Sequence, residues 1–468
     1  MSVTAAGATT AVRVETMGTE SLGDRSYLVT DGEVALVVDP QRDIDRVLEM
    51  AGRLGVRITH VAETHLHNDY VTGGLALARA TGATYLVPAG ADVSFQRRAV
   101  TDGEEIEVSP RLGVVVIATP GHTFHHVAYA LEIDGDRAGV FSGGSLLYGS
   151  VGRPDLVGPE HTEELAHVQY DSARRLGREL PGDAAVYPTH GFGSFCSATQ
   201  ATGEASTIAA EAQSNPALSM DEGDFVSSLL AGLDAYPAYY AHMGAANAAG
   251  PDLADLSPPE PVDAAELSRR IDAGEWVVDL RERRAFARSH VAGSFNFGLD
   301  GALATYLGWL IPWGTPLTLL GESPEQVAVA QLELARIGMD RPTGAAAGSP
   351  DEWVMTGREL RAFRRATFGE LAAARTEDGG PVVLDVRRRL EWEESHIPGA
   401  LHIPLHELTS RLDELPTAEI WVHCAAGYRA SIAASILDAD GRSVVAIDDD
   451  YDPGASRAGL TVEGDRRG

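Results

Sequence analysis

The sequence predicts an α/β protein with about three consecutive domains, and three observations support this fold class. Apolar stretches of strand length alternate with stretches of helical periodicity over residues 1–250. A strand followed by Asp-x-Arg, and later by His-x-x-Gly, occurs twice in the C-terminal half. The chain has 468 residues, which suits three domains of roughly 150 residues each. Its hydrophobic share of 44% is ordinary for globular proteins and allows several separate cores.

Charge and cysteine content exclude several classes of protein. The formal net charge of −31 argues against a nucleic-acid partner, because phosphate binding needs clustered basic residues. Two cysteines, Cys196 and Cys424, provide no disulfide framework, which indicates a reducing, cytoplasmic setting. No apolar run is long enough to span a bilayer, and Met1–Thr10 lacks the pattern of a secretory signal. We therefore expect neither nucleic acid nor a membrane as a partner.

Residues 12–249 are expected to form one α/β unit. Two strands, Tyr27–Val29 and Val34–Val38, are expected to pair around the Asp31-Gly32 turn. A helix with one apolar face, a buried strand and a second helix follow at 43–54, 58–63 and 74–81. Further apolar strands are expected at 112–119, 127–133, 138–141 and 185–187. Several of these strands end in a turn with His or Gly, which indicates a site along one edge of a sheet.

The buried strand at 58–63 leads into a motif with metal-binding character. Alternate side chains of an extended backbone share a face, so His65, His67 and Asp69 can point the same way. Later strands end close to His122 and His190. Imidazole and carboxylate groups that converge at strand ends are suitable metal ligands. The alternative is a polar loop with surface histidines.

An internal repeat follows a segment that is rich in Pro, Asp and Ser and is interpreted as a linker. In the same register and without a gap, Val277–Arg281 matches Val383–Arg387, and Ser289–Gly293 matches Ser395–Gly399. Two copies of one α/β domain therefore follow the linker. The expected organisation is a first domain, a linker and two repeats at 1–250, 251–261, 262–350 and 351–468.

The second copy contains a cysteine at a strand-to-helix turn. The predicted strand Ile420–His423 leads into Cys424-Ala425-Ala426-Gly427-Tyr428-Arg429, and a helical run begins at Ala430. Backbone N–H groups at a helix N-terminus favour an anion, which should stabilise a thiolate that carries sulfur as a persulfide. The small residues let the backbone curl around the sulfur, and Arg429 can neutralise an anionic donor such as thiosulfate. The alternative is a buried structural cysteine.

This segment, together with Asp385-Val386-Arg387 and His396–Ala400, resembles a rhodanese domain, a sulfurtransferase with a cysteine-based six-residue loop. The resemblance covers about residues 367–460 and implies that Cys424 is the catalytic nucleophile. The first copy shares the scaffold signatures but has no cysteine, and its equivalent loop falls near Thr318–Glu322. It resembles an inactive rhodanese module with a structural role or a role in interdomain contacts.

With Pro120-Gly121-His122 and Pro188-Thr189-His190, the first domain resembles the metallo-β-lactamase fold, an αββα sandwich. Its Gly152–Asp155 and Gly193–Cys196 segments, with the rhodanese fusion, resemble those of persulfide dioxygenases. The resemblance implies one non-haem iron(II) and oxidation of a thiol persulfide to sulfite. The resemblance implies that His65 and His122 are the iron-binding histidines. It also implies that His67, Asp69 and His190 occupy further positions of the metal cluster.

The motifs depart from that family at two positions. Tyr70 stands where a further histidine is usual, and Gly144 stands where the family has an aspartate iron ligand. The usual set of two histidines and one carboxylate is therefore incomplete at its expected position. Either the two motif histidines and His122 hold the metal, or Asp69 supplies the carboxylate. The expected cofactor is iron(II), with zinc or no metal as alternatives.

These motifs together indicate an enzyme of sulfide and persulfide metabolism. The first domain would oxidise a low-molecular-weight thiol persulfide to sulfite, with Arg153 and Tyr70 lining the pocket. Cys424 would pass sulfane sulfur to or from sulfite, thiosulfate or a thiol. Arg153 is expected to pair with Asp155. Cys196 is expected to be a small buried core residue, with a pocket residue or an acceptor of a persulfide as the alternatives.

The alternatives are a sulfurtransferase with a metal-poor first domain, a metal-dependent thioester or lactone hydrolase, and a non-enzymatic sulfur carrier or sensor. A homo-oligomer is the expected assembly.

Overall fold

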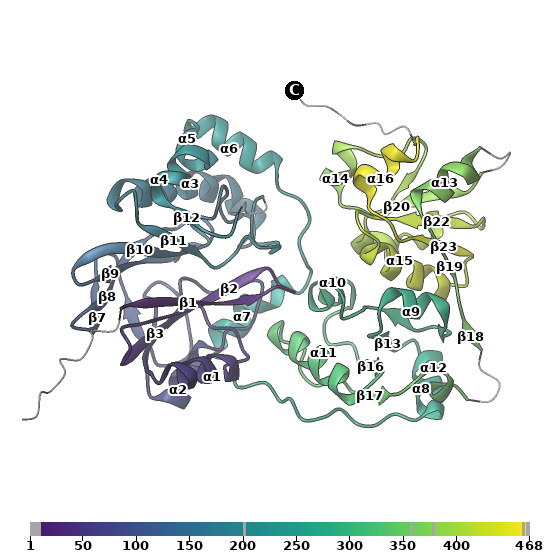
Figure 1. Cartoon of the computed structure of the whole chain (residues 1–468), viewed down its shortest axis with the longest axis horizontal. Helices are drawn as coiled ribbons and strands as arrows, with labels where there is room; N and C mark the ends of the chain where they lie inside the picture. The colour runs from purple at the N-terminus through teal and green to yellow at the C-terminus, as the bar shows by residue number, and fades with distance from the viewer. Residues whose placement is uncertain (1–10, 200–202, 356–358, 377–379, 461–463, 465–468) are drawn as a thin grey trace, which may run out of the picture. The chain divides into compact units, whose positions relative to one another are not determined.

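The computed structural model describes residues 11–199, 203–355, 359–376, 380–460 and 464 (Figure 1). It divides into two compact units. The first comprises residues up to 254 together with 335–338, and the second comprises 255–334 and 339–468. Apart from residues 335–338, both predicted repeats fall in the second unit, and the domain limits inferred from the sequence stay a prediction. Within the described ranges, no helix combines enough length and apolar character to cross a membrane.

Two six-stranded sheets form the centre of the first unit, in the orders β1-β2-β3-β4-β5-β6 and β12-β11-β10-β9-β8-β7. The strands are β1 (Arg13–Thr19), β2 (Asp24–Thr30), β3 (Val34–Val38), β4 (Arg57–Ala62), β5 (Thr84–Pro88), β6 (Arg98–Val100), β7 (Glu105–Ser109), β8 (Leu112–Ala118), β9 (Val127–Ile133), β10 (Asp136–Gly143), β11 (Ala185–Pro188) and β12 (Ser206–Thr207). The helices are α1 (Asp45–Leu54), α2 (Gly74–Thr81), α3 (Thr162–Glu179), α4 (Ile208–Ser214), α5 (Pro216–Ser219), α6 (Glu222–Ala231) and α7 (Tyr240–Ala249).

The period of two in the strands explains the layers of this unit. Ala35 and Val37 of β3 pack with α1 and α2, whereas Leu36 and Val38 pack with the second sheet. Helices α3 to α6 cover the other face of the second sheet. Each fully buried Val or Leu side chain contributes roughly 1.5–3 kcal/mol to the stability of such a core. Figure 1 shows helices, sheet, sheet and helices in that order, so the predicted αββα sandwich is confirmed.

Strand direction brings several loops to one edge of each sheet. In the first sheet β3 and β4 are parallel, so Asp39 and His65 follow strands that end together. In the second sheet β9 is antiparallel to both β8 and β10, and β11 is parallel to β10. The loops after β8, β10 and β11, which carry His122, Gly144 and His190, therefore leave from the same edge.

The sequence-based element predictions differ from the structure mainly in what they leave out. The helix expected at 74–81 matches α2, and the strands expected at 34–38, 127–133 and 420–423 match β3, β9 and β22. The other predicted elements shift by one to three residues at an end. The edge strand β1 was not predicted, because its burial alternates only weakly along the strand. Helices α3 to α7 were not predicted either. Residues 251–260 contain no helix or strand, as expected for a linker.

The second unit contains two mainly parallel sheets, in the orders β15-β13-β16-β17 and β19-β23-β22-β20-β21. The strands are β13 (Trp276–Asp279), β14 (His290–Val291), β15 (Phe295–Asn296), β16 (Leu317–Gly321), β17 (Gly344–Ala347), β18 (Leu360–Arg361), β19 (Arg364–Ala366), β20 (Val382–Asp385), β21 (Leu401–His402), β22 (Ile420–His423) and β23 (Val444–Ile447). The helices are α8 (Ala264–Asp272), α9 (Arg283–Arg288), α10 (Leu303–Leu310), α11 (Pro324–Arg336), α12 (Pro350–Trp353), α13 (Phe368–Arg375), α14 (Arg389–Glu394), α15 (Tyr428–Ala439) and α16 (Tyr451–Arg457).

The two sheets repeat one arrangement down to individual hydrogen bonds. In the first, Arg281 binds the Asp279 carboxylate and donates to the Ser289 carbonyl oxygen at 2.8 Å. In the second, Arg387 binds Asp385 in the same way and donates to the Ser395 carbonyl oxygen at 2.6 Å. The strand pairs β13·β16 and β20·β22 are both parallel.

The equivalent loop of the first repeat is shorter than predicted. The pairs Asp279–Leu320 and Asp385–His423 put Gly321 opposite Cys424 in the repeat. Most of the range Thr318–Glu322 expected to be a loop belongs to β16, and only two residues separate β16 from α11. Four residues separate β22 from α15. The first repeat therefore lacks both the cysteine and the length of chain needed to surround one.

The two repeats pack through α15, the helix that follows Cys424. The Ser431 hydroxyl donates to Asn296 Oδ1 at 2.7 Å, and the Asn296 N–H donates to Ser435 Oγ at 3.0 Å. Nearby, His290 Nε2 lies 3.1 Å from the Asp438 carboxylate. One side of the helix is therefore covered by β14 and β15 of the first repeat.

Candidate metal centre and cysteine loop

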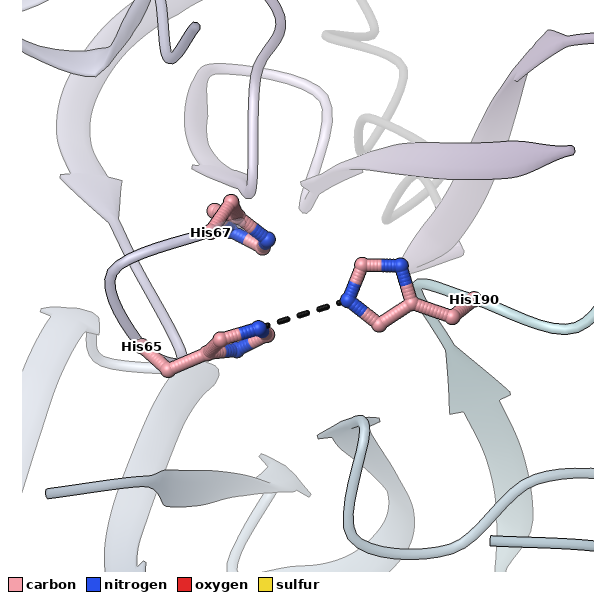
Figure 2. A group of neighbouring side chains, drawn as sticks. All are labelled: His65, His67 and His190. Atoms are coloured by element: carbon pink, nitrogen blue, oxygen red, sulfur yellow. Dashed lines mark hydrogen bonds between the residues drawn. The ribbon is translucent and has the colours of Figure 1, made fainter. Parts of the chain in front are cut away.

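His65 and His190 face one another at the centre of the first unit (Figure 2). Their Nε2 atoms lie 3.3 Å apart, and both side chains are buried. The Thr64 hydroxyl donates to Asp39, so its oxygen accepts from His65 Nδ1 at 2.9 Å. The outer nitrogen of His65 is thus occupied by the protein, and its inner nitrogen points to the centre.

His67 is held by two buried carboxylates. Its Nε2 lies within ion-pair distance of Asp39 Oδ1, at 3.2 Å, and of Glu63 Oε2, at 3.3 Å, and neither ring nitrogen has a hydrogen-bond partner. Burial alone would lower the pKa of His67, but the two carboxylates outweigh it and raise that pKa to about 9. The Tyr70 ring stacks on His67 at 4.3 Å between centroids, and its hydroxyl donates to the Asp39 carbonyl oxygen.

His190 is anchored in the same manner by two other carboxylates. Its Nδ1 lies 2.9 Å from Asp24 Oδ1 and 3.0 Å from Asp69 Oδ2. Burial opposes the charged imidazole, but Asp69 and Asp24 raise the pKa of His190 to about 10. Burial and the neighbouring Asp69 raise the pKa of Asp24 to about 7. Asp69 therefore orients His190 here, and its Oδ1 has no partner; its predicted role as a metal ligand stays a prediction.

His122 occupies the space next to the missing carboxylate. Its Nδ1 donates to the Arg153 carbonyl oxygen at 2.9 Å, and its Nε2 has no hydrogen-bond partner. A Cβ atom at Gly144 would lie 2.3 Å from His122 Cδ2, and one at Gly152 would lie 2.6 Å from His122 Nδ1. The ring is thus held between two glycines. Burial and the charged His190 lower the pKa of His122 to about 3.

The four histidines share a pattern that is typical of metal ligands. In each ring the outer nitrogen contacts a protein oxygen, which fixes the ring, and the inner nitrogen faces the cluster. The inner nitrogens of His67 and His122 have no other partner, although both residues are fully buried. Ligand atoms of His65, His67 and His190 lie within 4.8 Å of one another. The donor set therefore fits a divalent transition metal.

Sequence reasoning missed the groups that orient these rings, above all Asp39, Glu63 and Asp24. Asp39 and Glu63 directly follow apolar strands, and this position could have indicated that their carboxylates lie at the same sheet edge as the histidines. His126 also lies in the cluster, but the Gly144 N–H donates to its Nε2 and its Nδ1 contacts Thr119 Oγ1. Both of its nitrogens are therefore used by the protein.

Arg153 is buried and paired with the protein. It binds both oxygens of Asp155, at 2.6 and 2.7 Å, as the sequence predicts. Its guanidinium also donates to the carbonyl oxygens of Phe195 and Asp234. A substrate carboxylate would have to compete with these contacts, so the predicted substrate-lining role of Arg153 stays a prediction.

In the second unit, the Cys424 sulfur lies at the N-terminus of α15. It accepts the backbone N–H groups of Gly427 at 3.2 Å and Ala430 at 3.3 Å. Gly427 has a φ of 88° in the left-handed region, and a Cβ there would lie 2.6 Å from Asp448 Oδ1. The residue therefore has to be glycine for the loop to curl around the sulfur. Cys424 is buried, whereas Ala426 at the loop tip is exposed.

Arg429 is paired inside the protein with a residue that the sequence analysis did not identify. Its two terminal nitrogens donate to Glu391 of α14 at 2.6 and 2.7 Å, a bidentate pair. Burial opposes ionisation of Glu391, but Arg429 lowers the pKa of that carboxyl to about 2. The charge expected to meet an anionic donor is thus already balanced by a carboxylate.

The first repeat forms part of the surroundings of this loop. The Tyr428 hydroxyl donates to the Gly298 carbonyl oxygen at 2.9 Å. A narrow cavity of about 10 Å³ lies beside Arg429, with room for about one water. Its walls combine α10 of the first repeat with the second repeat, through Tyr306, Trp309, Leu310, Val386, Arg388, Leu405, His406 and Arg429.

Comparison with known proteins identifies the class of protein that this fold and site define. Residues 24–191 match the metallo-beta-lactamase superfamily, and residues 368–453 match the rhodanese-like domain. The chain therefore carries a metallo-β-lactamase domain and a C-terminal rhodanese-like domain, as the sequence predicts. The resemblance of the first domain to persulfide dioxygenases is also confirmed, because such enzymes are among its homologues.

Individual relatives differ in their named activity. The chain is 29% identical to human mitochondrial persulfide dioxygenase ETHE1 over 207 residues, which are 43% of this chain and 74% of that protein. It is 32% identical to a hydroxyacylglutathione hydrolase of Polaromonas sp. over 171 residues, 36% of this chain and 62% of that protein. A solved metallo-β-lactamase from Staphylococcus aureus matches with a TM-score of 0.64 and 27% identity, covering 73% of this chain and 99% of that one.

Proposed function

We propose that this chain is an enzyme of sulfur metabolism with two active sites. The first domain oxidises a low-molecular-weight thiol persulfide to sulfite, and Cys424 transfers sulfane sulfur. The observation that carries this proposal is the Cys424 sulfur held by two backbone N–H groups at a helix N-terminus. The similarity of the first domain to human persulfide dioxygenase supports the other activity.

The Cys424 site suits a double displacement of sulfur. The thiolate attacks the sulfane sulfur of a donor, a new S–S bond forms, and the donor's own S–S bond breaks. Thiosulfate leaves as sulfite, and a thiol persulfide leaves as the thiolate. The N–H groups of Gly427 and Ala430 stabilise the negative charge on the sulfur before and after transfer. An acceptor such as sulfite then takes the sulfur, which regenerates Cys424.

In the first domain, the inner nitrogens of His65, His67, His122 and His190 would hold the metal. A bound iron(II) would supply the redox chemistry for the net reaction of a persulfide with O₂ and water to a thiol and sulfite. The protein's part is to fix the four rings through Asp39, Glu63, Asp24 and Asp69 and to exclude water. The sulfite formed would be an acceptor for the persulfide on Cys424, which gives the fusion a chemical rationale.

A second candidate is hydrolysis of a glutathione thioester by a metal-bound hydroxide. The similarity to hydroxyacylglutathione hydrolases favours it. A two-metal site is disfavoured, because Gly144 has no carboxylate that could bridge two ions. The Asp69 carboxylate is already paired with His190. A third possibility, sulfur transfer alone, would apply if the first domain bound no metal.

We further propose that residues 262–350 form a cysteine-free, rhodanese-like domain that supports the catalytic one. Its matching Asp-x-Arg contacts and strand order favour this assignment. A homo-oligomeric, cytoplasmic enzyme stays our prediction, and light scattering on the purified chain tests the oligomeric state.

Three measurements, on the wild-type protein and on Cys424→Ser, test the proposed function. Elemental mass spectrometry on chelator-free protein should find about one iron per chain, and oxygen uptake should depend on glutathione persulfide. Sulfur transfer from thiosulfate to cyanide should be lost in Cys424→Ser, while oxygen uptake persists. Zinc at the same occupancy with thioester hydrolysis would favour the second candidate. Full sulfur transfer by Cys424→Ser would refute the assigned nucleophile.

A further inference from the structure

The histidine cluster has a fifth group that can ligate a metal, the side chain of Cys196. This residue is fully buried in the loop between β11 and β12. Its sulfur and one nitrogen each from His122 and His190 all lie within 4.8 Å of one another. His190 also belongs to the group formed with His65 and His67. Through His122 and His190, the sulfur borders the histidine cluster at its His122 end.

His122 supplies an independent sign that a ligand belongs at this end. Its Nδ1 donates to the Arg153 carbonyl oxygen, so its Nε2 carries a lone pair. That Nε2 is buried and has no hydrogen-bond partner. Leaving such an atom unpaired costs free energy unless something else binds it. A metal shared with Cys196 would satisfy it.

The backbone holds Cys196 in place. Its N–H donates to Ser194 Oγ at 3.1 Å, and its carbonyl oxygen accepts the Arg153 N–H at 2.9 Å. Arg153 is the residue whose own carbonyl oxygen fixes His122. One segment thus positions both the imidazole and the thiol, which is the support that a metal site needs. The Cys196 thiol also lies close to Asp69 and Tyr240.

We propose that Cys196 is a metal ligand that replaces the carboxylate missing at Gly144. The Gly144 position cannot carry a side chain while His122 stays where it is, because a Cβ there would lie 2.3 Å from the ring. The anionic donor comes instead from the loop after β11. A thiolate with imidazoles selects a borderline metal such as Zn²⁺, Fe²⁺ or Co²⁺. On binding, the thiol loses its proton to solvent and the metal–sulfur bond forms.

This inference rests on the metal site of the proposed function but not on persulfide oxidation. The two can therefore fail separately. The alternative is a buried structural thiol that binds no metal. A direct view of sulfur at the metal separates these possibilities.

The chain offers a clean experiment, because it has only two cysteines. In full-length Cys424→Ser, Cys196 is the one remaining thiol. Metal-depleted protein is loaded with Co²⁺ and followed by near-ultraviolet absorption, and the Zn²⁺ form is studied by X-ray absorption. We expect a sulfur-to-cobalt charge-transfer band and one sulfur scatterer at about 2.3 Å from zinc. Metal should also protect Cys196 from alkylation.

Two further variants in the same background complete the test. Cys196→Ser should lose the band and bind Co²⁺ about tenfold or more weakly. Ser197→Ala, a neighbouring buried residue, is the matched control and should keep both. Metal bound without a sulfur signal would overturn the proposal and leave the proposed function standing. If no variant binds metal, both the Cys196 proposal and the proposed metal-dependent function of the first domain are refuted. If Cys196→Ser does not fold, the spectra of Cys424→Ser alone decide.

Discussion

The Glu391–Arg429 pair gives the sharpest prediction about the cysteine loop. Glu391→Gln removes the charge that balances a buried guanidinium but keeps the shape of the side chain. In the folded protein the pKa of Glu391 falls from 4.5 to about 2. At about 1.4 kcal/mol for each tenfold change in proton affinity, this corresponds to about 3 kcal/mol of stability at neutral pH. Breaking a buried pair from one side costs a similar amount.

The pH dependence has a definite sign. Because the folded pKa is the lower one, the contribution is fully present above pH 4.5 and is lost as the pH falls toward 2. The stability difference between wild type and Glu391→Gln should therefore shrink over that range. Urea unfolding followed by tryptophan fluorescence measures it, because all six tryptophans lie in the second unit.

A matched control is available on the same helix. Glu393 pairs with Arg389 at the surface, where such pairs contribute about 0–1 kcal/mol. Glu393→Gln should therefore unfold almost like wild type. Equal destabilisation by both substitutions, or a Glu391→Gln protein within about 1 kcal/mol of wild type at pH 7, would refute the reasoning.

Three further predictions concern positions defined by close packing. Gly427→Ala should destabilise the second unit by about 1–2 kcal/mol and slow sulfur transfer, because a Cβ there meets Asp448. Gly441 has a similar φ, but a Cβ there would meet no other atom, so Gly441→Ala should lower stability without slowing sulfur transfer. Equal rates of sulfur transfer in the two variants would contradict this expectation. Gly144→Asp should displace the His122 ring, which should lower the melting temperature and weaken metal binding. Tighter metal binding in a calorimetric titration would refute this, because the ring would then have moved aside. Trp309→Ala should change KM for a bulky persulfide more than for thiosulfate, because the indole lines the cavity beside the loop, and unchanged KM values for both donors would disprove that role.

Features set by neighbouring residues could be predicted from the sequence. The repeat was recognisable because the Asp-x-Arg pair closes within three residues, as Asp279 with Arg281. The cysteine loop was recognisable for the same reason, since Gly427 and Ala430 are close to Cys424 in the chain. The clustered histidines stood out through their position at strand ends.

Features that depend on distant parts of the chain could not be predicted in this way. Asp39 reaches His67 only because β3 and β4 are neighbours, and Glu391 reaches Arg429 from another helix. The sequence indicated the loss of a carboxylate at Gly144, but not that the His122 ring lies in the same space. Such contacts depend on the packing of elements rather than on local pattern.

The contacts of α15 with the first repeat set a limit on how the chain can be divided. Ser431, Ser435 and Asp438 are buried polar residues whose partners, Asn296 and His290, belong to the cysteine-free copy. Cutting the chain ahead of the second repeat would bring these side chains into water and remove their partners. Deletion of the first repeat is therefore expected to be costly, although it carries no cysteine. The first repeat thus supports the helix that follows Cys424.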